Sequence, residues 1–380
     1  MLRSFGRNCQ TGGAVEPANR SRKTSWWVSS RSLPDPGIVT RTFEIWARQL
    51  SRGLGRGMQR RKLGRTGLEV SEIAHGLWGM GDWTDSDDRQ SLASLQLAVD
   101  LGCNFFDSAW SYGNGKSDAL LGQILRRKGK QPLYAASKIP PLNDKWPASS
   151  KDRYRDVFPR AHVFDYARKI REALGVDAID VLQFHVWDDS WTDEPEFQAT
   201  VQELKATGLI RFFGLSLNRW EPDNGIQAIR TGLVDVVQVI YNVFDQAPED
   251  RLFPLCRELD IGVIARVPLD EGSLGGKLTA ATRFPDQDWR SRYFGPENLP
   301  NTVDRVDQLK VVLPSDMSLA EMALRFILSN PVVSTTIVGM RKPDHIRENI
   351  RASDRGSLDS ALLGRLRTYR WSRVPAPWSD

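Results

Sequence analysis

Short apolar runs alternate with longer amphipathic segments along most of this chain, from about residue 60 onwards. Between residues 86 and 101, for example, Leu92, Leu95 and Val99 recur at the spacing of one helix face, and Gly102 follows as a stop signal. The apolar runs are short, as expected of strands buried on both faces. Eight runs are predicted as strands: 73–76, 104–107, 133–137, 180–184, 210–215, 234–240, 261–266 and 335–338.

This alternation predicts an α/β fold in which each strand is followed by a helix that packs on the sheet. Eight such units fit a closed (β/α)8 TIM barrel. The competing arrangement, a doubly wound Rossmann sheet, usually has a glycine-rich first strand-to-helix turn, which is missing here. Before the first strand, KLGRTGLEVS at 62–71 predicts an N-terminal hairpin because Gly64 and Gly67 separate two short apolar stretches.

Charge divides the chain into two parts. Residues 1–57 hold 10 of the 52 basic and 3 of the 47 acidic residues, which leaves 42 and 44, a net charge of −2, for the remainder. The near-neutral remainder gives no reason to expect nucleic acid as a partner. We expect residues 58–380 to form the barrel domain. The arginine-rich segment 1–57 is interpreted as a disordered extension or as sequence upstream of a start at Met58, with a transit peptide as the alternative.

Cysteine usage and hydropathy bear on the compartment. The three cysteines, Cys9, Cys103 and Cys256, are far apart and odd in number, which favours a reducing compartment over a disulfide framework. No apolar run approaches the length of a membrane span, so we expect no membrane association. A cytoplasmic location is the expectation that follows.

Four residues with catalytic potential lie at or just after the carboxyl ends of three consecutive predicted strands, the face on which barrel enzymes carry their active sites. They are Asp107, Tyr112, Lys138 and His185. A phenol becomes a useful acid near neutral pH when a neighbouring cation lowers its pKa. Lys138, held by Asp107, would serve as that cation for Tyr112, and His185 would hydrogen-bond a carbonyl oxygen. Such a site supplies a proton but no reductant, so a hydride must come from a cofactor.

The chain resembles the aldo-keto reductase family over nearly all of residues 60–350. The resemblance is carried by the motifs GCNFFDSAWSYG, YAASKI, DVLQFH, FFGLSLN, VVQVIYN, RVPLDEGSLGGK and IVGMRKPDHIRENI, in that order. It implies that Asp107, Tyr112, Lys138 and His185 form the catalytic tetrad, with Tyr112 as the acid. It also implies NADPH, bound in an extended form across the barrel mouth, and reduction of a small carbonyl substrate.

The resemblance assigns cofactor contacts by position. Ser216 and Gln238 match groups that hold the nicotinamide carboxamide, and Arg341 suits the 2′-phosphate because guanidinium binds phosphate oxygens in a fork. The loop over the pyrophosphate corresponds to 268–277, where glycines allow close backbone approach. The loop contacts are Pro268, Leu269, Gly272, Leu274 and Lys277; the adenosine end is Gly339, Arg341, His345, Glu348 and Asn349.

Two departures from the family pattern concern the cofactor. Leu217 stands between Ser216 and Asn218, where many members have serine followed directly by asparagine. Arg266 occupies a position where many members have an aromatic residue stacked on the nicotinamide; its planar guanidinium offers a stacking face, and the alternative is that it points elsewhere.

Tryptophans in the loops after strands suggest an apolar or aromatic substrate pocket. Trp78, Trp110 and Trp187 are the pocket candidates, together with Trp83 and Trp191. A second interpretation of the whole chain keeps the cofactor residues and drops catalysis: some barrels of this family, such as the β subunits of voltage-gated potassium channels, act as cofactor-binding partners of other proteins.

Three other kinds of site do not fit the spacing of the residues. Gly214-Leu215-Ser216 begins like a hydrolase nucleophile elbow but lacks the final glycine. A P-loop ending at Lys277 would need glycine at Glu271. The four histidines show no zinc-ligand spacing, so no metal is expected.

Overall fold

Eight parallel strands close into a barrel in the computed structural model of the chain, which describes residues 58–81, 86–127, 129 and 131–379. The barrel order is β10-β3-β4-β5-β6-β7-β8-β9, and β10 closes the ring on β3 with Thr336 opposite Ile73. The strands are β3 (Ile73–Gly76), β4 (Phe105–Asp107), β5 (Tyr134–Ile139), β6 (Ile179–Phe184), β7 (Ile210–Ser216), β8 (Val236–Ile240), β9 (Gly262–Arg266) and β10 (Thr335–Gly339). The predicted (β/α)8 fold is confirmed.

A two-stranded hairpin covers the amino-terminal end of the barrel, as predicted. Its strands are β1 (Arg60–Lys62) and β2 (Glu69–Ser71), with Arg61 opposite Val70. The Arg65 amide in its turn bonds the Asp260 carbonyl, just before β9 begins. Hairpin and strand side chains share one apolar cluster: Leu63, Leu68, Val70, Ala74, Phe105, Ala136, Val181, Val236 and Ile264. The hairpin therefore closes one end of the barrel and leaves the carboxyl ends of the strands open.

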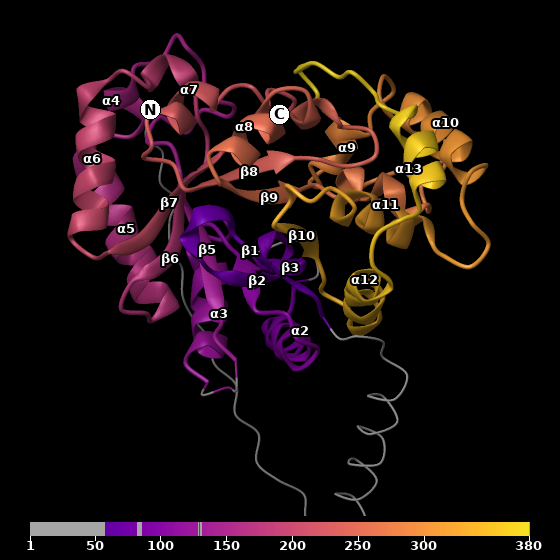
Figure 1. Cartoon of the computed structure of the whole chain (residues 1–380), viewed down its shortest axis with the longest axis horizontal. Helices are drawn as coiled ribbons and strands as arrows, with labels where there is room; N and C mark the ends of the chain where they lie inside the picture. The colour runs from indigo at the N-terminus through magenta and orange to yellow at the C-terminus, as the bar shows by residue number, and fades with distance from the viewer. Residues whose placement is uncertain (1–57, 82–85, 128, 130, 380) are drawn as a thin grey trace, which may run out of the picture. The chain divides into compact units, whose positions relative to one another are not determined.

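Helices surround the strands (Figure 1). The amphipathic pattern of the helices explains which of their faces is buried. Polar caps fix several helix starts; the Asp87 carboxylate, for example, accepts from the Gln90 amide. The helices are α2 (Asp88–Asp100), α3 (Lys116–Leu125), α4 (Tyr154–Val157), α5 (Arg160–Leu174), α6 (Pro195–Ala206), α7 (Ile226–Arg230), α8 (Leu252–Glu258), α9 (Arg290–Tyr293), α10 (Leu299–Lys310), α11 (Leu319–Leu328), α12 (Pro343–Arg355) and α13 (Ser360–Arg367).

Local chemistry explains where the elements differ from the sequence pattern. Residues 222–231 have a helical pattern in the sequence, but the helix α7 begins only after Gly225, whose φ of 155° lies outside the helical region. The long loops after β5 and β9 contain the one-turn helices α4 and α9. Lys138 lies inside β5, one residue before its end.

Two further expectations concern the N-terminal segment and membrane association. Residues 1–57, interpreted from the sequence as an extension, lie outside the described residues. Within the described part of the chain, no helix is both long and apolar enough to cross a membrane.

Candidate active site

The four candidate residues lie together at the open end of the barrel. Asp107 ends β4, and its Oδ2 lies 2.7 Å from Nζ of Lys138 on the neighbouring strand β5. The same ammonium donates to the Ser108 carbonyl at 2.8 Å and lies 5.2 Å from the centroid of the Tyr112 ring. The Tyr112 and His185 rings meet edge to face with centroids 5.7 Å apart. The sequence prediction that these residues converge is supported by this geometry.

Two glycines shape the loop that carries Tyr112. A Cβ on Gly81 would lie 2.4 Å from the Tyr112 carbonyl carbon, so only glycine lets the two backbones pass at this distance. Gly115 has φ of 87°, and a Cβ there would lie 2.6 Å from the Trp110 ring. The loop between β4 and α3 therefore packs tightly on both sides, and Tyr112 is held beside Lys138 by backbone contacts as well as by charge.

Burial and neighbouring charges together set the protonation of Lys138 and Tyr112, and one expectation from the sequence is wrong. Burial alone would lower the pKa of Lys138, but the Asp107 carboxylate and Tyr112 raise it above its ordinary value, so the ammonium keeps its charge. The pKa of Tyr112 was expected to fall toward neutrality. Burial instead raises it, and the opposing effect of Lys138 is smaller. Tyr112 is thus a phenol that holds its proton, beside a cation that would stabilise the phenolate left after donation.

His185 is a neutral imidazole. Burial, followed by the positive charges of Lys138 and Arg266, holds the pKa of His185 well below its ordinary value. Its Nδ1 lies 3.2 Å from the Ser111 hydroxyl oxygen. If that hydroxyl donates to Nδ1, the other ring nitrogen carries the proton and can donate a hydrogen bond to a substrate oxygen.

A second set of buried polar residues, Gln238, Ser137 and Asp118, lies next to the tetrad. Gln238 on β8 donates to Asp107 Oδ1 at 2.7 Å, so both carboxylate oxygens of Asp107 are engaged. The Ser137 hydroxyl donates to Asp118 Oδ1 at 2.9 Å. Burial raises the pKa of Asp118 to about 6. No residue of this supporting set except Gln238 was singled out from the sequence, because α3 and β5 meet only in the folded chain.

A cleft of about 1270 Å³ opens over the tetrad. Its walls include Trp78 and Trp110, as predicted, and two tryptophans that the sequence did not single out, Trp146 and Trp289. Trp146 lies in the long loop after β5 and Trp289 in the long loop after β9. Both loops follow the carboxyl ends of strands, and this position could have identified the two tryptophans from the sequence. Trp187 is a correction: it is fully buried, and its ring packs 4.7 Å from Phe197 between the barrel and α6. Trp191 is buried in the same cluster, and Trp83 lies outside the described residues.

The cleft runs from the tetrad to the start of α12, and most of the predicted cofactor residues lie along it. Lining residues among them are Gln238, Arg266, Pro268, Leu269, Gly272, Gly339, Arg341 and His345. Ser216, Leu274 and Asn349 are instead buried, and Lys277 and Glu348 are exposed outside this lining. The contacts assigned to these five residues stay predictions.

Arg266 faces the cleft rather than away from it. Its Nη2 donates to the Leu217 carbonyl at 2.9 Å, which gives the inserted Leu217 a structural role. Its Nε is buried and has no hydrogen-bond partner within the described part of the chain. Burial, together with the positive charge of the nearby Arg219, lowers the pKa of Arg266 to about 10. A buried, incompletely satisfied guanidinium at the cleft floor is a natural contact for a polar or anionic ligand.

Comparison with known proteins settles the family. The model of the Aldo/keto reductase family matches residues 72–369. This chain belongs to that family. Aldo/keto reductases are oxidoreductases that act on carbonyl compounds with nicotinamide cofactors, and the chain is an oxidoreductase of this kind.

Relatives of this aldo/keto reductase include both an enzyme and a probable channel subunit. It is 26% identical to the NADH-specific methylglyoxal reductase of Escherichia coli (strain K12), covering 78% of this chain and 93% of that protein. It is 30% identical to the probable voltage-gated potassium channel subunit beta of Arabidopsis thaliana, covering 78% and 92%. Among solved structures, the aldo-keto reductase AKR11C1 from Bacillus halodurans (holo form) has the same fold, with a TM-score of 0.66, 23% identity and coverage of 85% and 100%.

Proposed function

We propose that this aldo/keto reductase reduces an aldehyde or ketone to the alcohol with NADPH. The observation that carries the proposal is the placement of Lys138 Nζ, 2.7 Å from Asp107 and 5.2 Å from the Tyr112 ring centroid, at the floor of a cleft that extends to Arg341. A charged ammonium beside a protonated phenol is the arrangement needed to give a proton to a carbonyl oxygen that is gaining negative charge.

Each tetrad residue has a separate part in the proposed reaction. Tyr112 donates its proton to the substrate oxygen. Lys138 stabilises the phenolate that remains, and Asp107 keeps Lys138 charged and in place. His185, neutral at physiological pH, donates a hydrogen bond to the same oxygen and so fixes the carbonyl beside Tyr112. The cofactor, when bound, supplies a hydride to the carbonyl carbon.

Features of the cleft fit an extended dinucleotide. Its volume of about 1270 Å³ leaves room for a substrate as well, and the buried Arg266 Nε has no protein partner among the described residues. Arg341, at the far end, would hold the 2′-phosphate. The helix α12 begins at Pro343, two residues later, and its positive end would favour the same phosphate.

The aromatic walls favour an apolar or aromatic carbonyl compound as substrate. The ring centroids of Trp78 and Trp289 are 5.3 Å apart, and those of Trp146 and His185 are 4.7 Å apart. Both pairs stand over the tetrad side of the cleft, where the substrate would enter. Trp78 and Trp146 remain about 40% exposed, so a flat ring bound against them would remove apolar surface from water.

A second candidate function is that of a cofactor-binding partner of another protein, favoured by the 30% identity to a probable channel β subunit. One experiment tests both functions. The purified protein is mixed with NADPH and a panel of aromatic and aliphatic aldehydes, and loss of NADPH absorbance is followed. Turnover of at least one aldehyde is the result expected for a reductase. Tight NADPH binding with no turnover across the panel would favour the partner role.

A further inference from the structure

The loop after β9 has an unusual backbone where it lines the cleft. Val267, Asp270 and Glu271 all have left-handed φ angles, 57°, 45° and 55°, and Gly272 follows at 100°. Residues other than glycine rarely adopt a left-handed backbone conformation, and β-branched residues such as valine do so least of all. Such conformations persist where the surrounding structure imposes them. Val267, Glu271 and Gly272 also line the cleft, so whatever holds this loop also shapes the cofactor site.

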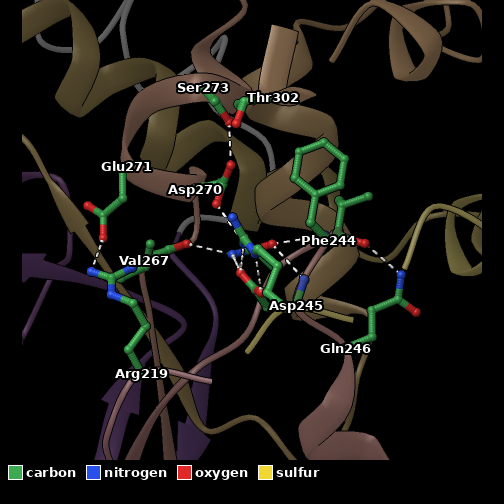
Figure 2. A network of polar contacts seen from close by, with 12 residues as sticks. Arg219, Phe244, Asp245, Gln246, Val267, Asp270, Glu271, Ser273 and Thr302 are labelled. Carbon is green, nitrogen blue, oxygen red and sulfur yellow. Dashed lines mark hydrogen bonds and ion pairs between the residues drawn. The ribbon is translucent and has the colours of Figure 1, made fainter. Parts of the chain in front are cut away.

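Each of the three residues other than glycine has one anchor from outside the loop. Figure 2 shows the pair of Arg219 and Glu271 among them. The Asn242 amide donates to the Val267 carbonyl at 3.0 Å. Arg219 Nη2 lies 2.6 Å from Glu271 Oε1. The third anchor is Arg373, in the segment after α13, whose Nη2 lies 2.7 Å from Asp270 Oδ1. Two of the anchors follow barrel strands, whereas Arg373 belongs to the carboxyl-terminal tail, residues 368–379.

The Arg373 guanidinium is fixed from every side. It pairs with Asp245 as well as with Asp270, and its Nη1 lies 3.1 Å from the Tyr293 hydroxyl. It also lies over the rings of Trp220 and Trp371, 4.8 and 4.7 Å from their centroids. Only 3% of the side chain is exposed. A planar, always charged group with several donors can bridge two carboxylates in this way, which lysine does not match.

We propose that Arg373 is a positioning residue: it holds the loop 267–276 in its strained conformation over the cleft and thereby slows release of the nicotinamide dinucleotide. The inference rests on the proposed function, since the loop is expected to cover the cofactor. Asp270 is the point of contact on the loop, and Asp245 fixes the other side of the guanidinium. Arg373 therefore acts on the cofactor site through Asp270, without lining the cleft itself.

Two variants and one matched control test this role. Asp270→Asn removes the charge on the loop side and keeps an oxygen acceptor for the Ser273 hydroxyl, and asparagine tolerates a left-handed φ. Arg373→Gln removes the anchor itself. Arg370→Gln is the control, because Arg370 lies on the same tail and pairs with Asp250 at 2.5 Å, in an exposed pair away from the loop. Asp270→Asn keeps the test decisive if Arg373→Gln folds poorly.

The readout is the rate of NADPH release, measured by the decay of NADPH fluorescence after rapid mixing with excess NADP+. We expect release to be about tenfold faster in Asp270→Asn and Arg373→Gln, because a charge-assisted contact is lost, and unchanged in Arg370→Gln. The control Arg370→Gln should also keep the single-turnover rate at saturating NADPH within about twofold of the wild type.

Two outcomes would overturn the inference, and they separate it from the proposed function. Release rates in folded Asp270→Asn within about twofold of the wild type would show that Arg373 does not set cofactor retention, and its role would be structural alone. A wild-type protein that binds no NADPH would overturn the proposed function and this inference with it.

Discussion

Two buried ion clusters of this molecule differ in what holds their partners together. The Asp107–Lys138 pair joins neighbouring barrel strands, and its residues are 31 positions apart in the sequence. The Arg373 cluster joins the tail to Asp270 and Asp245, which are 103 and 128 positions away. The first is positioned by the hydrogen bonds of the sheet. The second itself positions a loop, so removing a charge should have different consequences in the two places.

From that difference we expect the two clusters to affect different steps, chemistry in one case and cofactor release in the other. The strand pair fixes the atoms that take part in the proposed proton transfer, and both of its residues lie on hydrogen-bonded barrel strands. The tail cluster fixes a loop whose backbone is strained and which lines the cleft. Substitutions in the first should change the rate of chemistry, and substitutions in the second should change how long the cofactor stays.

The largest effect is expected from Lys138→Met, which leaves the Asp107 carboxylate buried without its cation. We expect the free energy of unfolding to fall by ~3–5 kcal/mol and the turnover of any aldehyde substrate to be lost. Urea unfolding followed by tryptophan fluorescence measures the first effect. Lys205→Met is the matched control: it breaks a partly exposed pair with Asp235, which retains Arg65, and should cost below ~1 kcal/mol. Equal costs for both variants would contradict this account of the strand pair.

Asp118→Asn is expected to have a smaller, pH-dependent effect on the free energy of unfolding. Asp118 accepts a hydrogen bond from Ser137, the residue before Lys138. Burial raises the pKa of native Asp118 from 3.8 to about 6, so the native state binds more protons than the unfolded state between these values. The free energy of unfolding therefore falls as pH rises from 3.8 to about 6. The total decrease is at most ~3 kcal/mol, and it is fully reached above this range. The neutral variant should be more stable than the wild type at pH 7.5 and close to it near pH 4, as measured by urea unfolding at both. A gain of the same size at both pH values would contradict the titration.

The smallest effect is expected at the far end of the cleft, from Arg341→Ala. We expect the affinity for NADPH to fall about tenfold and the affinity for NADH to change little, because the guanidinium is proposed to bind the 2′-phosphate. Fluorescence titration with each cofactor measures both. Arg347→Ala is the control, because Arg347 lies in the helix α12 that follows Arg341 and pairs with Asp344 at the exposed surface. Equal losses for NADPH and NADH would remove Arg341 from the phosphate site.

The barrel and the tetrad could be predicted from the sequence because both depend on short-range order. Each apolar run was a strand, and parallel strands bring their carboxyl ends to one face, so Asp107, Lys138 and His185 had to converge. Element bounds shifted by a few residues where turns decided them, as at Gly225.

Features that depend on burial or long-range packing could not be predicted in this way. Trp187 follows a strand just as His185 does, yet its ring turns into the core against Phe197. The rise in the pKa of Tyr112 depends on how deeply the ring is buried, which the order of residues does not express. Arg373 lies in a tail with no periodic pattern, and only the folded chain brings it to Asp270.

The central claim is that Tyr112, beside Lys138, gives the proton in carbonyl reduction. Single-turnover oxidation of bound NADPH by an aldehyde that the wild type reduces, compared between the wild type and Tyr112→Phe, tests this most directly. The account predicts a rate at least ~100-fold lower in the variant, with the dissociation constant for NADPH within about twofold. A Tyr112→Phe protein that reduces the aldehyde at the wild-type rate would contradict it.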